Sequence, residues 1–180
     1  TPYTTTATTP TFQWAPGSPH TIAVSSPQGS AGTQFTFQGW SDGGPASHPV
    51  SPTAATTYTA NFSTSYQLTT EALPSAAAGS LNQGNGSYHL ANTNIQVTAN
   101  ANSGYVFNNW SFDASGTSNP VSVFMNGPKT VKANFGPAPA GITVTTNPPG
   151  LQVIVDGTPY TSPTPPLQWT PGINHTIAVQ

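Results

Sequence analysis

The sequence predicts an all-β protein made of small antiparallel, β-sandwich-like repeat modules in tandem. Three observations predict this class: apolar and polar residues alternate over short runs, turn-forming residues separate the runs, and whole segments recur. Alternation with a period of two places every second side chain on one buried face of a sheet. No stretch combines helical periodicity with capping residues, so we expect no helix.

The alternating runs occupy two successive stretches of the chain. In the first, up to residue 64, they centre on Ile22, Phe37 and Ala60, with Pro- and Gly-containing clusters between them. In the second, residues 66–136, they lie at 66–68, 95–99, 105–107, 121–125 and 131–135. Asn126-Gly127 separates the last two runs and predicts a tight hairpin, because both residues tolerate positive φ.

The two stretches match each other in order and rough spacing. Phe-Gln-Gly-Trp-Ser at 37–41 parallels Phe-Asn-Asn-Trp-Ser at 107–111. His-Pro-Val-Ser at 48–51 parallels Asn-Pro-Val-Ser at 119–122, and both stretches close on Ala-Asn-Phe. We therefore interpret residues 1–64 and 66–136 as two related β-modules.

A second repeat relates the two ends of the chain. Thr-Pro-Tyr-Thr at 1–4 recurs at 158–161, and Trp14 with His20 recurs as Trp169 with His175, 155 residues later. The chain therefore holds slightly more than one period of a longer pattern, or it is a subunit whose tail resembles the head of its neighbour.

The segment before the tail copy predicts a linker and one more β segment. Residues 137–141 are rich in Pro and Ala, which predicts an extended linker. A strand starts at Ile142, turns at 148–150 and returns at 153–155, where Asp156-Gly157 predicts a tight turn. The head copy has no such strand pair before it, so we expect residues 142–180 to complete the next copy. The packing residues would be Ile142, Val144, Val153, Val155, Ile177 and Val179.

The composition excludes several classes of partner. Charged residues are 3% of the chain, Arg is absent, and the formal net charge is −2. Nucleic acids and anionic membrane surfaces are bound by clustered Lys and Arg, so we expect neither as a partner. No apolar run approaches the ~20 residues of a membrane-spanning helix, so we expect no membrane insertion. Without Cys the chain has neither disulfides nor thiolate metal sites.

These segments resemble two families of bacterial surface repeats. Residues 66–136, with Gly-Tyr-Val-Phe-Asn-Asn-Trp-Ser at 104–111, resemble the divergent internalin B-repeat domain, and residues 33–62 carry the same signature. Residues 142–180, with Pro-Gly at 149–150 and Val-Ile-Val-Asp-Gly at 153–157, resemble the PEGA-type module, which is split at the N-terminus. The resemblance implies small all-β modules strung along secreted or surface proteins.

Aromatic residues at equivalent positions are candidates for two roles. Exposed aromatic faces beside polar groups can bind a sugar. Recurrence at equivalent positions favours structural anchors instead, with each indole N–H bonded to a loop carbonyl. We expect the second role for Trp14, Trp40, Trp110, Trp169, Phe37, Phe62, Phe107 and Phe135.

Residues with catalytic or metal-binding chemistry are few and scattered. The four carboxylates are Asp42, Glu71, Asp113 and Asp156, and they fall in different segments, so no catalytic acid pair is expected. Asp42-Gly43-Gly44 predicts a tight turn, because no carboxylate follows at the spacing of a calcium loop. The histidines are expected at turns or strand ends, bonded to backbone. We therefore expect no enzymatic activity, no metal and no cofactor.

These features predict a non-enzymatic structural segment of an extracellular or cell-surface bacterial protein. It would build a stalk or fibre by end-to-end packing of β-modules, with further copies of itself as partners, joined covalently or by assembly. The alternative is a carbohydrate-binding or adhesin module that holds surface glycans through exposed aromatics.

Overall fold

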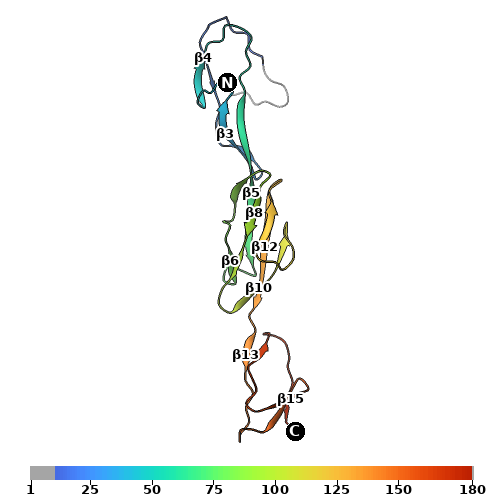
Figure 1. Ribbon diagram of the computed structural model, residues 1–180. Helices are drawn as coiled ribbons and strands as arrows, with labels where there is room; N and C mark the ends of the chain where they lie inside the picture. Colours follow the sequence, from blue (N-terminus) through green and yellow to red (C-terminus); the bar gives the residue numbers. More distant parts are fainter. Residues whose placement is uncertain (1–10, 180) are drawn as a thin grey trace. The chain divides into compact units, whose positions relative to one another are not determined.

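The computed structural model describes residues 11–179, and Figure 1 shows their strands. This range contains no helix, so the predicted all-β class of small antiparallel sheets is confirmed, and no segment of it could cross a membrane as a helix. The repeated tetrapeptide at residues 1–4 lies outside the described range. The strands are β1 (His20–Ala23), β2 (Gln28–Ser30), β3 (Thr33–Trp40), β4 (Ser47–Val50), β5 (Ala60–Leu73), β6 (Gly79–Leu81), β7 (Ser87–Leu90), β8 (Asn94–Val97), β9 (Ala99–Ala101), β10 (Tyr105–Phe112), β11 (Val121–Phe124), β12 (Lys129–Pro137), β13 (Ala140–Ile142), β14 (Gln152–Val155), β15 (Thr158–Thr161), β16 (Leu167–Trp169) and β17 (Ile177–Val179).

The chain divides into two compact units. The first comprises Thr1–Gln67, Tyr88–Thr93 and Met125–Pro128, and the second comprises Leu68–Ser87, Asn94–Phe124 and Lys129–Gln180. The module boundary expected at residue 65 falls inside β5, a strand of 14 residues. This strand contains neither Gly nor Pro, so its sequence offers no local reason to end there.

In the first unit, β3 pairs with β2 and with the first half of β5. The β3–β5 pair is antiparallel, from Thr33 opposite Tyr66 to Trp40 opposite Ala60, with a bulge after Phe37. In the same unit β1 pairs with β4, with His20 opposite Val50 and Ala23 opposite Ser47.

In the second unit, β12 pairs with β10 on one edge and with the end of β5 on the other. The β12–β10 pair is antiparallel, whereas β12 and β5 run parallel, Lys129 opposite Leu68. Two further antiparallel pairs are β8 with β11 and β6 with β9. Strands β11 and β12 pair with different strands and not with each other, so the prediction of a hairpin at Asn126-Gly127 is wrong. Neither residue has the positive φ that a two-residue type I′ turn requires.

The last part of the second unit is formed by residues 140–179. Asp156 and Gly157, at φ 48° and 79°, form the two-residue turn of the β14–β15 hairpin, and β14 pairs with β17 on its other edge. The predicted pairing of the strand at Ile142 with residues 153–155 is wrong, because β13 pairs with β16. The consecutive prolines at 148–149 lack the N–H groups that a tight hairpin would use. Strands β12 and β13 also extend into the linker expected at 137–141.

The two matched modules fold alike around an aromatic pair and a bulge. The rings of Phe37 and Phe62 meet edge to face at 5.8 Å, and those of Phe107 and Phe135 meet edge to face at 6.0 Å. Each module has its bulge between the first Phe and the Trp of the matched segment. The internal repeat in the sequence is therefore also a structural repeat.

Burial differs between the two units. The first unit contributes two apolar residues, Val50 and Met125, to the buried core of the described chain. The second contributes twelve: Leu68, Ala78, Val97, Ala99, Trp110, Ala114, Val123, Val131, Ala133, Phe135, Val153 and Val155. Since apolar burial is the main favourable term in folding, the first unit is the less strongly stabilised of the two.

Candidate functional site

Both end copies stack their tryptophan on their histidine. The ring centroids of Trp14 and His20 lie 3.9 Å apart at an interplanar angle of 11°, and those of Trp169 and His175 lie 4.3 Å apart at 4°. A Pro-Gly turn lies between the two residues in each copy, and its Gly has positive φ in both. The same local sequence therefore folds in the same way at both ends.

In the tail copy, Asp156 holds both His175 and the strand that follows it. Nδ1 of His175 donates to the Asp156 carboxylate at 2.7 Å, and the Thr176 N–H donates to Oδ1 at 2.8 Å. The Asp156 N–H in turn donates to the Thr176 carbonyl at 3.0 Å. The hydrogen bonds from His175 and Thr176 hold the pKa of Asp156 below its ordinary value, with the His175 bond the largest cause.

In the head copy, a hydroxyl takes the place of the carboxylate. Ser18 donates its hydroxyl hydrogen to the Ala15 carbonyl at 2.6 Å, so Nε2 of His20, 2.9 Å from Oγ, is the donor to Ser18. Within residues 11–179 no carboxylate pairs with His20. The two copies therefore share the stack and differ in what holds the histidine.

His48, which belongs to the first unit, is also held by an aspartate. Nε2 of His48 lies 2.9 Å from Oδ2 of Asp42, and its Nδ1 donates to the Pro45 carbonyl at 2.8 Å. Both ring nitrogens face acceptors, so the protonated ring is favoured, and the bond to Asp42 raises the pKa of His48. The same bond, with the Gly44 N–H, lowers the pKa of Asp42. The turn expected at Asp42-Gly43-Gly44 is confirmed by the bond from the Gly43 N–H to the Trp40 carbonyl.

The eight expected anchors differ in burial. Trp110 is 2% exposed and Phe135 6%, and the other six are half-buried. Nε1 of Trp110 donates to the Ser118 carbonyl at 2.8 Å, and Nε1 of Trp40 donates to the Ala46 carbonyl at 3.4 Å. Both indoles of the matched modules therefore bond a loop carbonyl, more tightly in the second unit.

The six residues expected to pack between copies fall into three groups. Val153 and Val155 are buried within their own unit, and Ile142 and Val144 are half-buried. Ile177 and Val179, both on β17, are 54% and 78% exposed. The exposed members of the set therefore lie on one short strand at the edge of its sheet.

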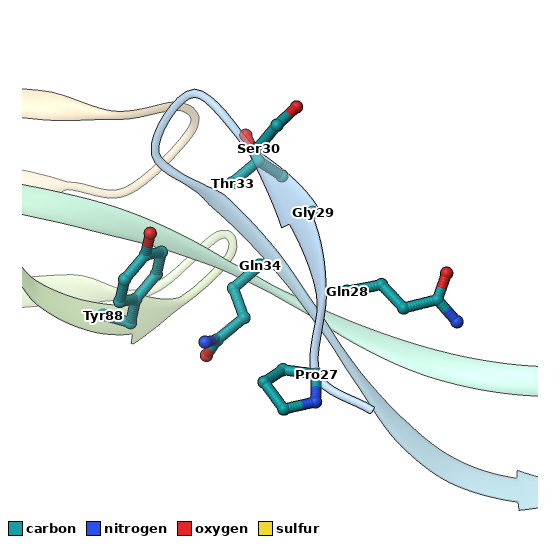
Figure 2. Close-up of a pocket in the computed structure, with 7 residues that line it drawn as sticks. All are labelled: Pro27, Gln28, Gly29, Ser30, Thr33, Gln34 and Tyr88. Atoms are coloured by element: carbon teal, nitrogen blue, oxygen red, sulfur yellow. The ribbon is translucent and has the colours of Figure 1, made fainter. Parts of the chain in front are cut away.

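Two shallow hollows mark the described surface. One, of about 200 Å³, is lined by residues of the β2–β3 hairpin and by Tyr88, and Figure 2 shows the side chains of Tyr88, Gln34 and Pro27 around it. The other, of about 280 Å³, is lined by Asp156, Tyr160, Gln168, Trp169 and His175, among others. Both combine at least one aromatic ring with at least one glutamine side chain.

Each carboxylate of the chain is paired with a different basic group. The pairs are Asp42 with His48, Asp113 with Lys129, Glu71 with Lys132 and Asp156 with His175. No group of three or more metal-ligating side chains occurs in the described range. Each side-chain carboxylate in the described range therefore has a basic partner of its own.

Comparison with known families bears on the central module. Residues 68–139 match the family model of the divergent InlB B-repeat domain. The resemblance expected for this segment is thereby confirmed, and we refer to residues 68–139 as the B-repeat module. The match does not reach the segment expected to be PEGA-like. No curated protein and no solved structure matches the chain.

Sequence reasoning missed the aspartate partners of His48 and His175. Both histidines were expected to bond backbone, and the Asp156–His175 pair joins residues 19 positions apart. Such a pairing depends on the register of β14 with β17, and no period in the sequence encodes that register. The recurrence of Trp and His at a fixed spacing was the available signal.

Proposed function

We propose that this chain is a non-enzymatic structural segment of a bacterial surface protein, in which β-modules packed end to end build a stalk or fibre outside the cell. The observation that carries the proposal is structural repetition: one aromatic-and-bulge module occurs twice, and one Trp–His stack occurs at both ends. Repeats that contact their neighbours form extended arrays.

The chemistry of the chain supports this assignment. The four carboxylates each pair with a separate basic group, which favours a structural role over a catalytic one. A charged fraction of 3% produces little repulsion between copies. The match of residues 68–139 to the divergent InlB B-repeat domain supports a place on a bacterial surface.

The proposal is tested by the length of covalent arrays. Polypeptides with one, two and four copies of residues 1–157 in series are measured by small-angle X-ray scattering. End-to-end packing predicts a maximum dimension that grows in proportion to copy number. Growth with a power of about 0.4 of chain length, as in a single globule, would overturn it.

The rival is a carbohydrate-binding module, favoured by the hollow that contains Trp169, Tyr160 and Gln168. A glycan array and a tryptophan-fluorescence titration test it. A saturable signal that is lost in Gln168→Ala and kept in Gln38→Ala, an exposed glutamine outside both hollows, would favour glycan binding. The structural proposal predicts no response in either assay.

A further inference from the structure

One extended segment of five residues occurs three times in the chain: in β1, from the end of β8 into β9, and in β17 with the two residues before it. A Pro-Val dipeptide occurs in both matched modules. In the first unit its Val50 lies opposite His20, and in the B-repeat module its Val121 lies opposite Val97. Residues 20–24 therefore correspond to residues 97–101, and the end repeat relates them to residues 175–179 as well. We call these three segments the head, middle and tail versions of the repeated strand. Their second residues are Thr21, Thr98 and Thr176.

The middle version has neighbours on both edges. On one edge Val97 pairs with Val121, and the N–H of Ala99 donates to Oδ1 of Asn119 at 2.9 Å. On the other edge Asn82, which follows β6, exchanges two bonds with Thr98. Its N–H donates to the Thr98 carbonyl at 3.1 Å, and its Oδ1 accepts from the Thr98 N–H at 2.7 Å.

The tail version repeats the bonds of this second edge. Asp156, at the end of β14, exchanges the same two bonds with Thr176 that Asn82 exchanges with Thr98. Hydrogen-bonded positions alternate along an antiparallel pair, so Ala178 also faces β14 while Ile177 and Val179 face the opposite edge. In the described chain no strand pairs with that opposite edge.

The head version of the repeated strand is paired on the edge that the tail version leaves unpaired. The Val24 N–H donates to the Ala46 carbonyl at 2.9 Å, so Ile22 and Val24 face β4, and Thr21 and Ala23 face away from it. Among residues 11–179 no strand pairs with the edge that carries Thr21 and Ala23. This is the edge that Asn82 and Asp156 occupy in the other two versions.

We propose that the Thr21–Ala23 edge of β1 is a docking site for β14 of a second copy of this chain, in the register that β14 adopts with its own β17. The proposal rests on the function proposed above, and it specifies the strands through which successive copies would pack. In that register the partner's Ile154 lies opposite Ala23, and the partner's Asp156 lies opposite Thr21 and beside His20.

When two copies dock, β14 of one copy exchanges the tail version on its edge for the head version of the other copy. The partner's β14 must release its own β17, which is three residues long and exposed at all three positions. It gains β1, which is longer and already carries β4 on its far edge. A sheet of three strands grows to four, and the two-stranded β1–β4 pair, which is marginal alone, joins it. Because head and tail are different surfaces, the contact is heterologous, and successive contacts extend as a filament unless the rotation between copies closes a ring.

The test is amide hydrogen exchange on the full chain over a range of concentrations, with sedimentation velocity in parallel. We expect exchange of the Thr21 and Ala23 amides to slow at least tenfold as concentration rises, together with formation of larger species. A variant that ends at His175 lacks β17, leaves β14 free and should associate at lower concentration. Exchange at Thr21 and Ala23 that is independent of concentration in both chains would overturn the proposal.

Ala23→Pro is the blocking variant, and Ala23→Ser, which keeps the N–H, is its control. The Ala23 N–H faces away from β4, so its loss spares the β1–β4 bonds, and a slow Val24 amide verifies this. Ile154→Pro removes the matching donor from the partner strand. Association lost in both Pro variants and kept in Ala23→Ser supports the docking, whereas unchanged association in both overturns it. The scattering experiment on covalent arrays does not depend on strand exchange, so the two proposals can fail separately.

Discussion

Asn134 and Asn109 meet across the bulge of the B-repeat module, where Nδ2 of Asn134 donates to the Asn109 carbonyl oxygen at 3.1 Å. The same amide group also donates to Oγ of Ser111 at 3.1 Å. In the first unit Asn61 repeats the bulge contact, with Nδ2 3.3 Å from the Gly39 carbonyl. The asparagine of the recurring Ala-Asn-Phe therefore satisfies a carbonyl that the bulge removes from the ladder.

Asn134→Asp should destabilise the B-repeat module. The substitution keeps the side-chain shape but replaces a donor with an acceptor, which leaves the Asn109 carbonyl without its partner. We expect a loss of roughly 1–3 kcal/mol in the free energy of unfolding, measured in urea. Asn61→Asp is the matched control. Its site is exposed and its bond longer, so its loss should be smaller, and equal losses would contradict the bulge argument.

Trp110 should make a larger contribution to stability than its counterpart Trp40. Trp110→Ala should cost about 3–5 kcal/mol, because the side chain is almost fully buried. Trp110→Phe keeps most of the apolar volume but leaves the Ser118 carbonyl unpaired, at about 1–3 kcal/mol. The same substitutions at Trp40, which is half-buried and has the longer hydrogen bond, should reduce the free energy of unfolding by less. Urea unfolding followed by circular dichroism measures all four variants.

Asp156→Ala should remove the side-chain hydrogen bond that holds the start of β17, whereas Asp156→Asn should largely keep it. The amide oxygen of Asn82 already accepts the equivalent bond from Thr98, so an Asn at position 156 can accept from Thr176. We expect faster hydrogen exchange at the Thr176 amide in Asp156→Ala than in Asp156→Asn. If both variants exchanged at the wild-type rate, Asp156 would not be holding this strand.

The Asp42–His48 pair should give the first unit a stability that depends on pH. The raised pKa of His48 means that its contribution is complete below the ordinary value of 6.5 and is lost as pH rises through the raised value. The lowered pKa of Asp42 means that its contribution is complete above 3.8 and is lost as pH falls through the lowered value. Asp42→Asn should flatten both limbs, as measured by thermal unfolding from pH 3 to 9.

Gly44→Ala gives an independent check on the same pair. A Cβ at this position would overlap the His48 ring, so the ring must move away from Asp42. The pKa of His48, followed by NMR, should then fall toward the ordinary histidine value. Gly43→Ala is the steric control, because a Cβ there meets no neighbouring atom, although its positive φ still costs stability. An unchanged pKa in Gly44→Ala would show that the pair does not depend on this close approach.

Several features followed from the sequence by itself. Alternation placed strands near Ile22, Phe37 and residues 131–135, because a half-buried strand must present every second side chain to the core. The Asp156-Gly157 turn followed from local backbone preferences, since both residues tolerate positive φ. Repetition indicated equivalent modules, and the resemblance of the central module to the divergent InlB B-repeat domain followed from the motif around Trp110.

Tertiary structure alone decided which strands pair. Asn126-Gly127 carries a hairpin motif, yet β11 pairs with β8 and β12 runs parallel to β5. The strand at Ile142 joins β16, although residues 153–155 were the expected partner. Partner choice depends on burial and hydrogen bonding between segments far apart in the chain, and a period of two is the same for every candidate partner. The sequence alone therefore indicated where several of the strands form, whereas the edge that each version of the repeated strand leaves unpaired could be seen only in the folded chain.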